Sequence, residues 1–158
     1  MRIRMIYVAA IAALSLTVAC GGKSKPADGD AMMKKTPPAG ASLYDRLGGE
    51  PAITAAVNEF VAIVVADERI NAFFKNADAD HLKKMLVEQL CAATGGPCKY
   101  TGKDMKTAHT GMNIKEEHFN ALVEDLGKAL TKLGVKEDVQ KDLVSALAPL
   151  KADIVTAK

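Results

Sequence analysis

The chain has 158 residues, which is enough for one domain with its own hydrophobic core but not for two large domains. Hydrophobic residues make up 49% and charged residues 25% of the sequence, a balance that excludes a fully disordered or fibrous protein. The formal net charge of +2 is too small to indicate a nucleic-acid partner. The cysteine count is three, so at least one cysteine has no partner within the chain.

Residues 1–19 have the features of a secretory signal peptide. Arg2 and Arg4 precede a charge-free apolar stretch of about 15 residues, shorter than a membrane-spanning helix needs. The segment 16–20 resembles a bacterial lipobox, in which Cys20 is lipidated and becomes the first residue of the mature chain. An uncleaved anchor and an ordinary secreted protein are the alternatives. We therefore expect a periplasm-facing lipoprotein of the cell envelope, attached to the outer membrane through its lipid.

Residues 20–41 are expected to form a flexible linker behind this lipidated cysteine. The segment contains Pro26, Pro37 and Pro38, several glycines and no run of apolar residues. Such a composition cannot bury enough apolar surface to offset the entropy lost on ordering. The folded domain is therefore expected to comprise residues 42–158.

Within that domain, apolar residues recur every three or four positions in several stretches, which predicts amphipathic helices. These stretches are 50–66, 78–94, 114–133 and 136–157, with a kink at Pro149 and a short helical segment or turn over 67–74. The segment 95–112 is rich in glycine and shows no periodicity. Because no strand-like alternation occurs, the sequence predicts an all-α fold. An irregular segment of this length usually has a function, and a bound prosthetic group would account for it.

Several short motifs, in a fixed order, resemble those of one protein family. They are Leu43-Tyr44-Asp45-Arg46-Leu47-Gly48-Gly49, Ala72-Phe73-Phe74, Gly95-Gly96-Pro97, Tyr100-Thr101-Gly102, Ala108-His109 and Ala148-Pro149-Leu150. With this order and spacing, residues 42–156 resemble a group I truncated haemoglobin. The resemblance implies a two-over-two helical sandwich around non-covalently bound haem b, with a diatomic gas (O₂, NO or CO) as the ligand.

The resemblance also assigns the residues that would hold the haem. His109 matches the proximal ligand of the iron, and globin iron takes a neutral imidazole nitrogen. Phe74 matches the phenylalanine that packs against the porphyrin, and Phe73 lies next to it in the sequence. Further haem contacts are expected from Val61, Leu82, Met85, Leu86, Tyr100 and Met105.

The chain departs from the family on the distal side, where the gas is held. Many group I members stabilise bound dioxygen with a tyrosine directly after the phenylalanine of the first long helix, and here Phe60 is followed by Val61. Leu86 occupies the position of a second donor, a glutamine. A hydrogen bond to polarised dioxygen contributes about 1.5–3 kcal/mol, so its loss would accelerate oxygen dissociation about ten- to hundredfold. We therefore expect an apolar distal pocket that suits NO and CO better than oxygen storage.

Met85 leaves a second function open. Its thioether could be a sixth iron ligand opposite His109, which would suit electron transfer, or it could simply fill an apolar gap. A redox role, whether nitric-oxide dioxygenation, peroxidase-like chemistry or electron transfer, would need a separate redox partner such as a reductase. No catalytic residue is assigned. A third alternative is a lipoprotein without haem, for instance a copper module that uses His81 and Met85 with His109 and Met112.

Cys91 and Cys98 remain as a pair once Cys20 is lipidated. In an oxidising compartment they are expected to form a disulfide. The loop-entropy formula predicts that this bond stabilises the folded state by about 2.5 kcal/mol. Two reduced thiols or a redox switch are the alternatives. Because Cys98 does not belong to a C-x-x-C-H motif, the haem is expected to be bound without a covalent link.

Overall fold

The computed structural model describes residues 40–157, and every regular element within that range is helical, as the sequence predicts. The signal segment and most of the linker, including Cys20, lie outside the described residues. The helices are α1 (Leu43–Leu47), α2 (Gly49–Ala66), α3 (Ala79–Ala93), α4 (Met105–His109), α5 (Glu116–Lys132), α6 (Glu137–Leu147) and α7 (Lys151–Ile154). Two short 3₁₀ turns cover Asn71–Phe73 and Ala148–Leu150.

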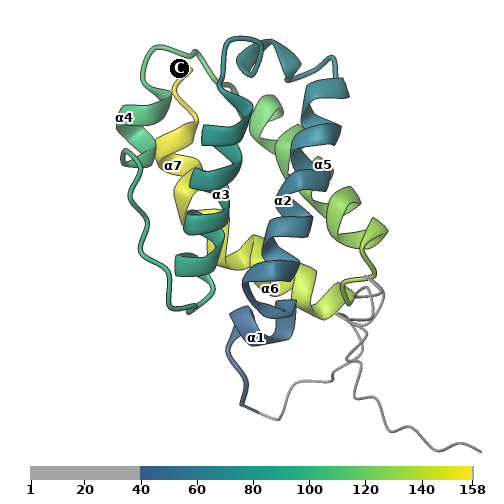
Figure 1. Cartoon of the computed structure of the whole chain (residues 1–158). Coiled ribbons are helices and arrows are strands. Elements are labelled where there is room, and N and C mark those ends of the chain that lie inside the picture. Colours follow the sequence, from purple (N-terminus) through teal and green to yellow (C-terminus); the bar gives the residue numbers. More distant parts are fainter. Residues whose placement is uncertain (1–39, 158) are drawn as a thin grey trace, which may run out of the picture.

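Helix α2 is the central element of the core. It packs against α3 and against α5, while α4 and α7 lie together on the far side of α3 (Figure 1). Its mean hydropathy of 1.4 over 18 residues would by itself suit a membrane span. Its apolar face is instead buried in the domain, which explains the hydropathy. The buried side chains of α2 are Ala52, Ile53, Ala56, Val57, Phe60, Val61 and Val64.

Paired glycines turn the chain between α1 and α2. Gly48 ends α1 with φ +101° and Gly49 opens α2 with φ +75°, conformations that favour glycine. A Cβ atom at Gly48 would lie 2.9 Å from the Cβ of Ala52. At the other end of α1, Ser42 and Asp45 form a reciprocal capping box. The five residues of α1 are too few for a periodicity, which is why the sequence analysis did not predict this helix.

Two elements differ from the sequence-based expectation. The segment 95–112 contains the short helix α4, which Asp104 caps by accepting a hydrogen bond from the backbone N–H of Thr107 at 2.8 Å. The last predicted helix is divided into α6, a 3₁₀ turn at Pro149 and α7, and it ends at Ile154. The interruption at Pro149 confirms the predicted kink, since proline lacks the N–H that a continuous helix needs.

The irregular residues before α4 are attached to the C-terminal end of α3. Cys91 and Cys98 form a disulfide. One turn earlier, the Glu88 carboxylate accepts hydrogen bonds from the backbone N–H and the hydroxyl of Thr101, at 3.0 and 2.6 Å. Tyr100 lies between these attachments and donates its hydroxyl proton to the backbone oxygen of Lys103 at 2.7 Å. A loop without regular structure is thereby held in place between α3 and α4.

Candidate functional site

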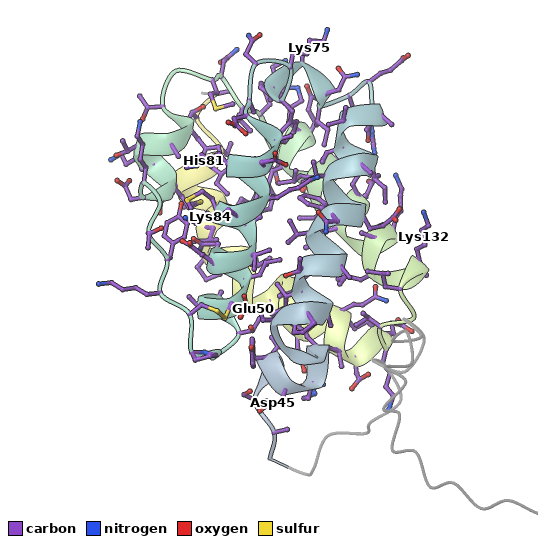
Figure 2. All side chains as sticks on the ribbon, viewed as in Figure 1. Asp45, Glu50, Lys75, His81, Lys84 and Lys132 are labelled. Atoms are coloured by element: carbon purple, nitrogen blue, oxygen red, sulfur yellow. A yellow bond between two sulfur atoms is a disulfide. The ribbon has the colours of Figure 1, made fainter. Side chains whose placement is uncertain are left out.

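A cavity of about 540 Å³ is lined by residues of α2, α3, α4, α5, the loop after α2 and the C-terminal segment. Its size is within the range of cofactor and small-ligand sites. Figure 2 labels His81, one of the lining residues, on α3 at the side that faces α4 and α7. Most of the lining is apolar. Its apolar side chains include Phe60, Phe73, Phe74, Leu82, Met85, Leu86, Leu90, Met105, Met112, Phe119, Leu122, Leu126, Leu147, Leu150 and Ile154.

His109 lies at the C-terminal end of α4 and lines this cavity. Its Nδ1 is 2.7 Å from the backbone oxygen of Met105, one turn earlier in the same helix. A carbonyl oxygen only accepts hydrogen bonds, so Nδ1 carries the proton and Nε2 carries the free lone pair. This tautomer and its fixed ring orientation are what an imidazole needs to bind a metal through Nε2.

Eight of the nine residues that the sequence analysis placed at the haem do line the cavity. They are Phe73, Phe74, Leu82, Met85, Leu86, Tyr100, Met105 and His109. Val61 is the exception: it and the preceding Phe60 both belong to the buried core, but only Phe60 also lines the cavity. Neighbouring helix residues point about 100° apart, so a single position decides which of the two faces the cavity.

The remaining aromatic and histidine side chains have distinct surroundings. Burial raises the pKa of the Tyr100 phenol. His81 is exposed at the edge of the cavity. His118 does not line the cavity. Its ring lies 4.9 Å from that of Phe73, and its Nδ1 accepts a hydrogen bond from the backbone N–H of Lys115 at 3.1 Å, so its contacts are structural.

Sequence reasoning missed Asp78, Lys103 and Thr107, which line the cavity, and also Gln89. Gln89 lies on α3, four residues after Met85 and seven after Leu82, and it lines the cavity with them. That helical spacing was the available signal. Its Oε1 atom is buried and has no hydrogen-bond partner. Along α3, the lining residues are therefore apolar except for His81 and Gln89.

The sequence of the domain matches a known family along its whole length. Residues 42–156 match the model of the bacterial-like globins. The group 1 truncated haemoglobin of Tetrahymena pyriformis is 41% identical over 114 residues, covering 72% of this chain and 94% of that protein. A second relative, from Mycolicibacterium paratuberculosis, is 40% identical over 118 residues, covering 75% of this chain and 87% of its own length. The chain belongs to the group 1 truncated haemoglobins.

Solved structures of such haemoglobins have the same fold. The ferric form of the Tetrahymena pyriformis protein superimposes with a TM-score of 0.71, covering 73% of this chain and 98% of that one, at 41% identity. The 2/2 haemoglobin of a Synechococcus species superimposes with a TM-score of 0.69, covering the same shares of the two chains, at 33% identity. The predicted all-α, two-over-two truncated globin fold is thereby confirmed.

The cofactor of this family is haem b with its iron. The cavity residues fit a haem group, because the lining is largely apolar and includes the His109 imidazole, whose Nε2 is free. Within residues 40–157, no group of three His, Cys, Asp or Glu side chains could hold a metal ion. The four residues of the copper alternative, His81, Met85, His109 and Met112, all line this same cavity.

Proposed function

We propose that this truncated haemoglobin binds diatomic gases reversibly at the bacterial cell envelope. The observation that carries the proposal is the His109 imidazole, whose Nδ1–H is held by the oxygen of Met105 and whose Nε2 is free to bind iron within the cavity. When bound, the haem supplies an iron atom with a coordination position for the gas. The protein fixes the imidazole, excludes water and determines which groups surround the gas.

The distal side is proposed to hold oxygen weakly compared with NO or CO. Leu86 lines the cavity where relatives carry a glutamine, and Val61 is a hydrocarbon where they carry a tyrosine. Neither side chain can donate a hydrogen bond. Because dioxygen gains more from a donor than CO does, we expect oxygen to dissociate about ten- to hundredfold faster than from relatives that carry both donors.

Absorption spectroscopy of the purified protein tests this proposal. Spectra of the ferric, ferrous and CO-treated forms should show a Soret band and a reversible change when CO is added. Stopped-flow mixing would then give the oxygen dissociation rate. Absence of a Soret band would refute haem binding. A slow oxygen dissociation rate would refute the proposed weak binding of oxygen.

The proposed location rests on the N-terminal sequence. Removal of residues 1–19 and lipidation of Cys20 would leave the globin on a linker of about twenty residues at the membrane. We expect the wild-type protein in the membrane fraction, labelled by radioactive palmitate. Cys20→Ala should lose the label and the membrane attachment. An unlabelled wild-type protein would contradict the proposed anchor.

A redox function is the second candidate, because Met85 lines the cavity on α3. A thioether bound opposite His109 would give a six-coordinate ferrous spectrum and would suit electron transfer or another reaction with a reductase partner. Methionine more often fills an irregular apolar gap. We therefore expect a five-coordinate, high-spin ferrous spectrum that Met85→Leu leaves unchanged, and a six-coordinate spectrum lost in that variant would favour the redox function.

A further inference from the structure

The helix that carries His109 is joined to α3 by an irregular loop. Among the helices, α4 packs chiefly against α7. Its connection to α3 is the loop 95–104, which leads from the end of α3 to the start of α4 (Figure 1). Within the part of the chain that the structure describes, residues 97–103 make no hydrogen bond between backbone groups. The shape of this loop therefore depends on its side-chain attachments.

Two side-chain attachments hold the loop to α3. One is the disulfide between Cys91 of α3 and Cys98 of the loop. The other is the Glu88 carboxylate, which accepts two hydrogen bonds from Thr101. Thr101 is exposed, so water competes for these hydrogen bonds and their net contribution is small. The disulfide is the attachment that water cannot replace.

The loop residues beyond the disulfide form part of the cavity wall. Tyr100, Gly102 and Lys103 line the cavity together with His109. The Tyr100 ring lies against the backbone of Gly102, where a Cβ atom would be 2.5 Å from its Cζ, and the Tyr100 hydroxyl donates to the Lys103 oxygen. These residues therefore move as one unit. Because Cys98 lies only two residues before Tyr100, the disulfide determines where this part of the wall is placed.

We propose that formation of the Cys91–Cys98 bond switches the domain into the state that retains haem, so that the dithiol form of the chain loses haem readily. This inference rests on the proposed haem-dependent function. The bond forms by thiol–disulfide exchange with the disulfide of an oxidising protein. One cysteine thiolate attacks that disulfide to give a mixed disulfide, and the other cysteine then displaces the sulfur of the oxidant. The chain gives up two electrons and two protons, and the oxidant leaves as a dithiol.

The surroundings of the two sulfur atoms favour a switch that acts in one direction. Cys91 is fully buried in the core, whereas Cys98 is partly exposed and packs against that core. An oxidant can reach both thiols before the loop has packed, but a reductant can approach the finished bond only from Cys98. The cytosol keeps thiols reduced. A chain exported as its N-terminal sequence predicts would therefore retain haem only after export.

The test compares haem dissociation from the full chain in its disulfide and dithiol forms. Haem-free protein is reduced with a phosphine, freed of the reagent under argon and loaded with ferric haem beside an oxidised sample. Free thiols are counted in both samples, and haem transfer to an excess of a haem-free acceptor globin is followed by absorbance. The loop-entropy formula limits the effect to about sixtyfold, so we expect the dithiol form to lose haem about tenfold faster or more. Reoxidation should restore slow loss.

Two variants separate the switch from a general loss of stability. Cys91→Ser with Cys98→Ser should lose haem as fast as the reduced wild type and should not respond to reduction or oxidation. Arg46→Gln is the control, because it removes the ion pairs between α1 and α6 and lies outside the cavity lining. It should keep slow haem loss in the oxidised form and the same response to reduction. Urea titration of the haem-free proteins verifies that each variant is folded.

Three outcomes would overturn the switch. Equal haem dissociation from the oxidised and reduced wild type would leave the disulfide a purely structural role. Fast haem loss from oxidised Arg46→Gln would attribute the effect to general instability. An effect of the phosphine that persists in the double serine variant would attribute it to the iron. Haem is bound in all three cases, so the proposed function stands, whereas an oxidised wild-type chain that binds no haem would refute that function itself.

Discussion

His109 obtains the tautomer of an iron ligand from its own helix. The carbonyl that accepts the Nδ1 proton belongs to Met105, four residues earlier in α4, at 2.7 Å. Asp104 starts this five-residue helix by capping the backbone N–H of Thr107. The orientation of the ring therefore depends on a short helix and its cap, and Nε2 is left without a hydrogen bond in a residue that lines the cavity.

Replacement of His109 tests that geometry directly. His109→Ala should abolish stoichiometric haem binding or change the ferrous spectrum, because the axial nitrogen is lost while the apolar cavity remains. His118→Gln is the control, since His118 contacts Phe73 outside the cavity and should keep both the haem and its spectrum. Haem content and absorption spectra are the measurements. If His109→Ala retained stoichiometric haem with an unchanged spectrum, the proximal assignment would be wrong.

At the scale of elements, the attachment of the 95–104 loop to α3 determines where α4 begins. The disulfide Cys91–Cys98 closes a ring across Gly95 and Gly96, and the Glu88 carboxylate holds Thr101. Hydrogen bonds from Thr101 to the carboxylate lower the pKa of Glu88. Few regular hydrogen bonds stabilise this loop, which makes these two attachments important for its stability.

Removal of the disulfide should therefore lower the stability of the domain. The loop-entropy formula predicts a loss of about 2.5 kcal/mol in the free energy of unfolding for Cys91→Ser with Cys98→Ser. Urea titration of wild type and double variant measures it. A reducing agent should lower the stability of the wild-type protein by a similar amount and leave the double variant unaffected. Equal unfolding midpoints for both proteins would show that this bond contributes nothing to stability.

At the scale of the whole molecule, ionic contacts join helices that are distant in sequence. Arg69, after α2, contacts the carboxylates of Asp67 at 2.6 Å and Glu124 of α5 at 2.8 Å. Arg46 of α1 contacts Asp138 and Asp142 of α6 at 3.0 and 2.5 Å. The pKa values of Asp67 and Asp138 are held below their usual value, that of Asp67 chiefly by the side-chain hydrogen bond from Arg69.

These depressed pKa values predict a sensitivity to acid. A carboxyl group whose pKa is lower in the folded state stabilises the fold at every pH above its unfolded pKa of about 4, and this contribution is lost as the pH falls further. The free energy of unfolding should therefore be constant near neutrality and decrease below about pH 4. The Asp67→Asn variant should have a lower free energy of unfolding than wild type at pH 7. Its free energy of unfolding should also decrease less than that of wild type when the pH is lowered. An identical pH profile for the variant would contradict this role of Asp67.

Much of the fold and of the site follows from local sequence. Helical periodicity predicted the long helices because each has one apolar side, and Pro149 predicted the break near the C-terminus. The short motifs pointed to His109, Phe73 and Phe74 at the haem. The same periodicity could not reveal α1 or α4, because five residues form little more than one turn.

Tertiary structure decided which side chains face the cavity. Val61 and Phe60 are adjacent in the sequence and both belong to the buried core, yet only Phe60 also lines the cavity. Gln89 became visible as a site residue only when α3 was seen beside the other helices. Length, charge and the N-terminal pattern are properties of the chain alone and already gave one domain of near-neutral charge behind a signal-like segment. Which residues share a cavity depends on the angle at which helices pack, and that angle is set by contacts between residues far apart in sequence.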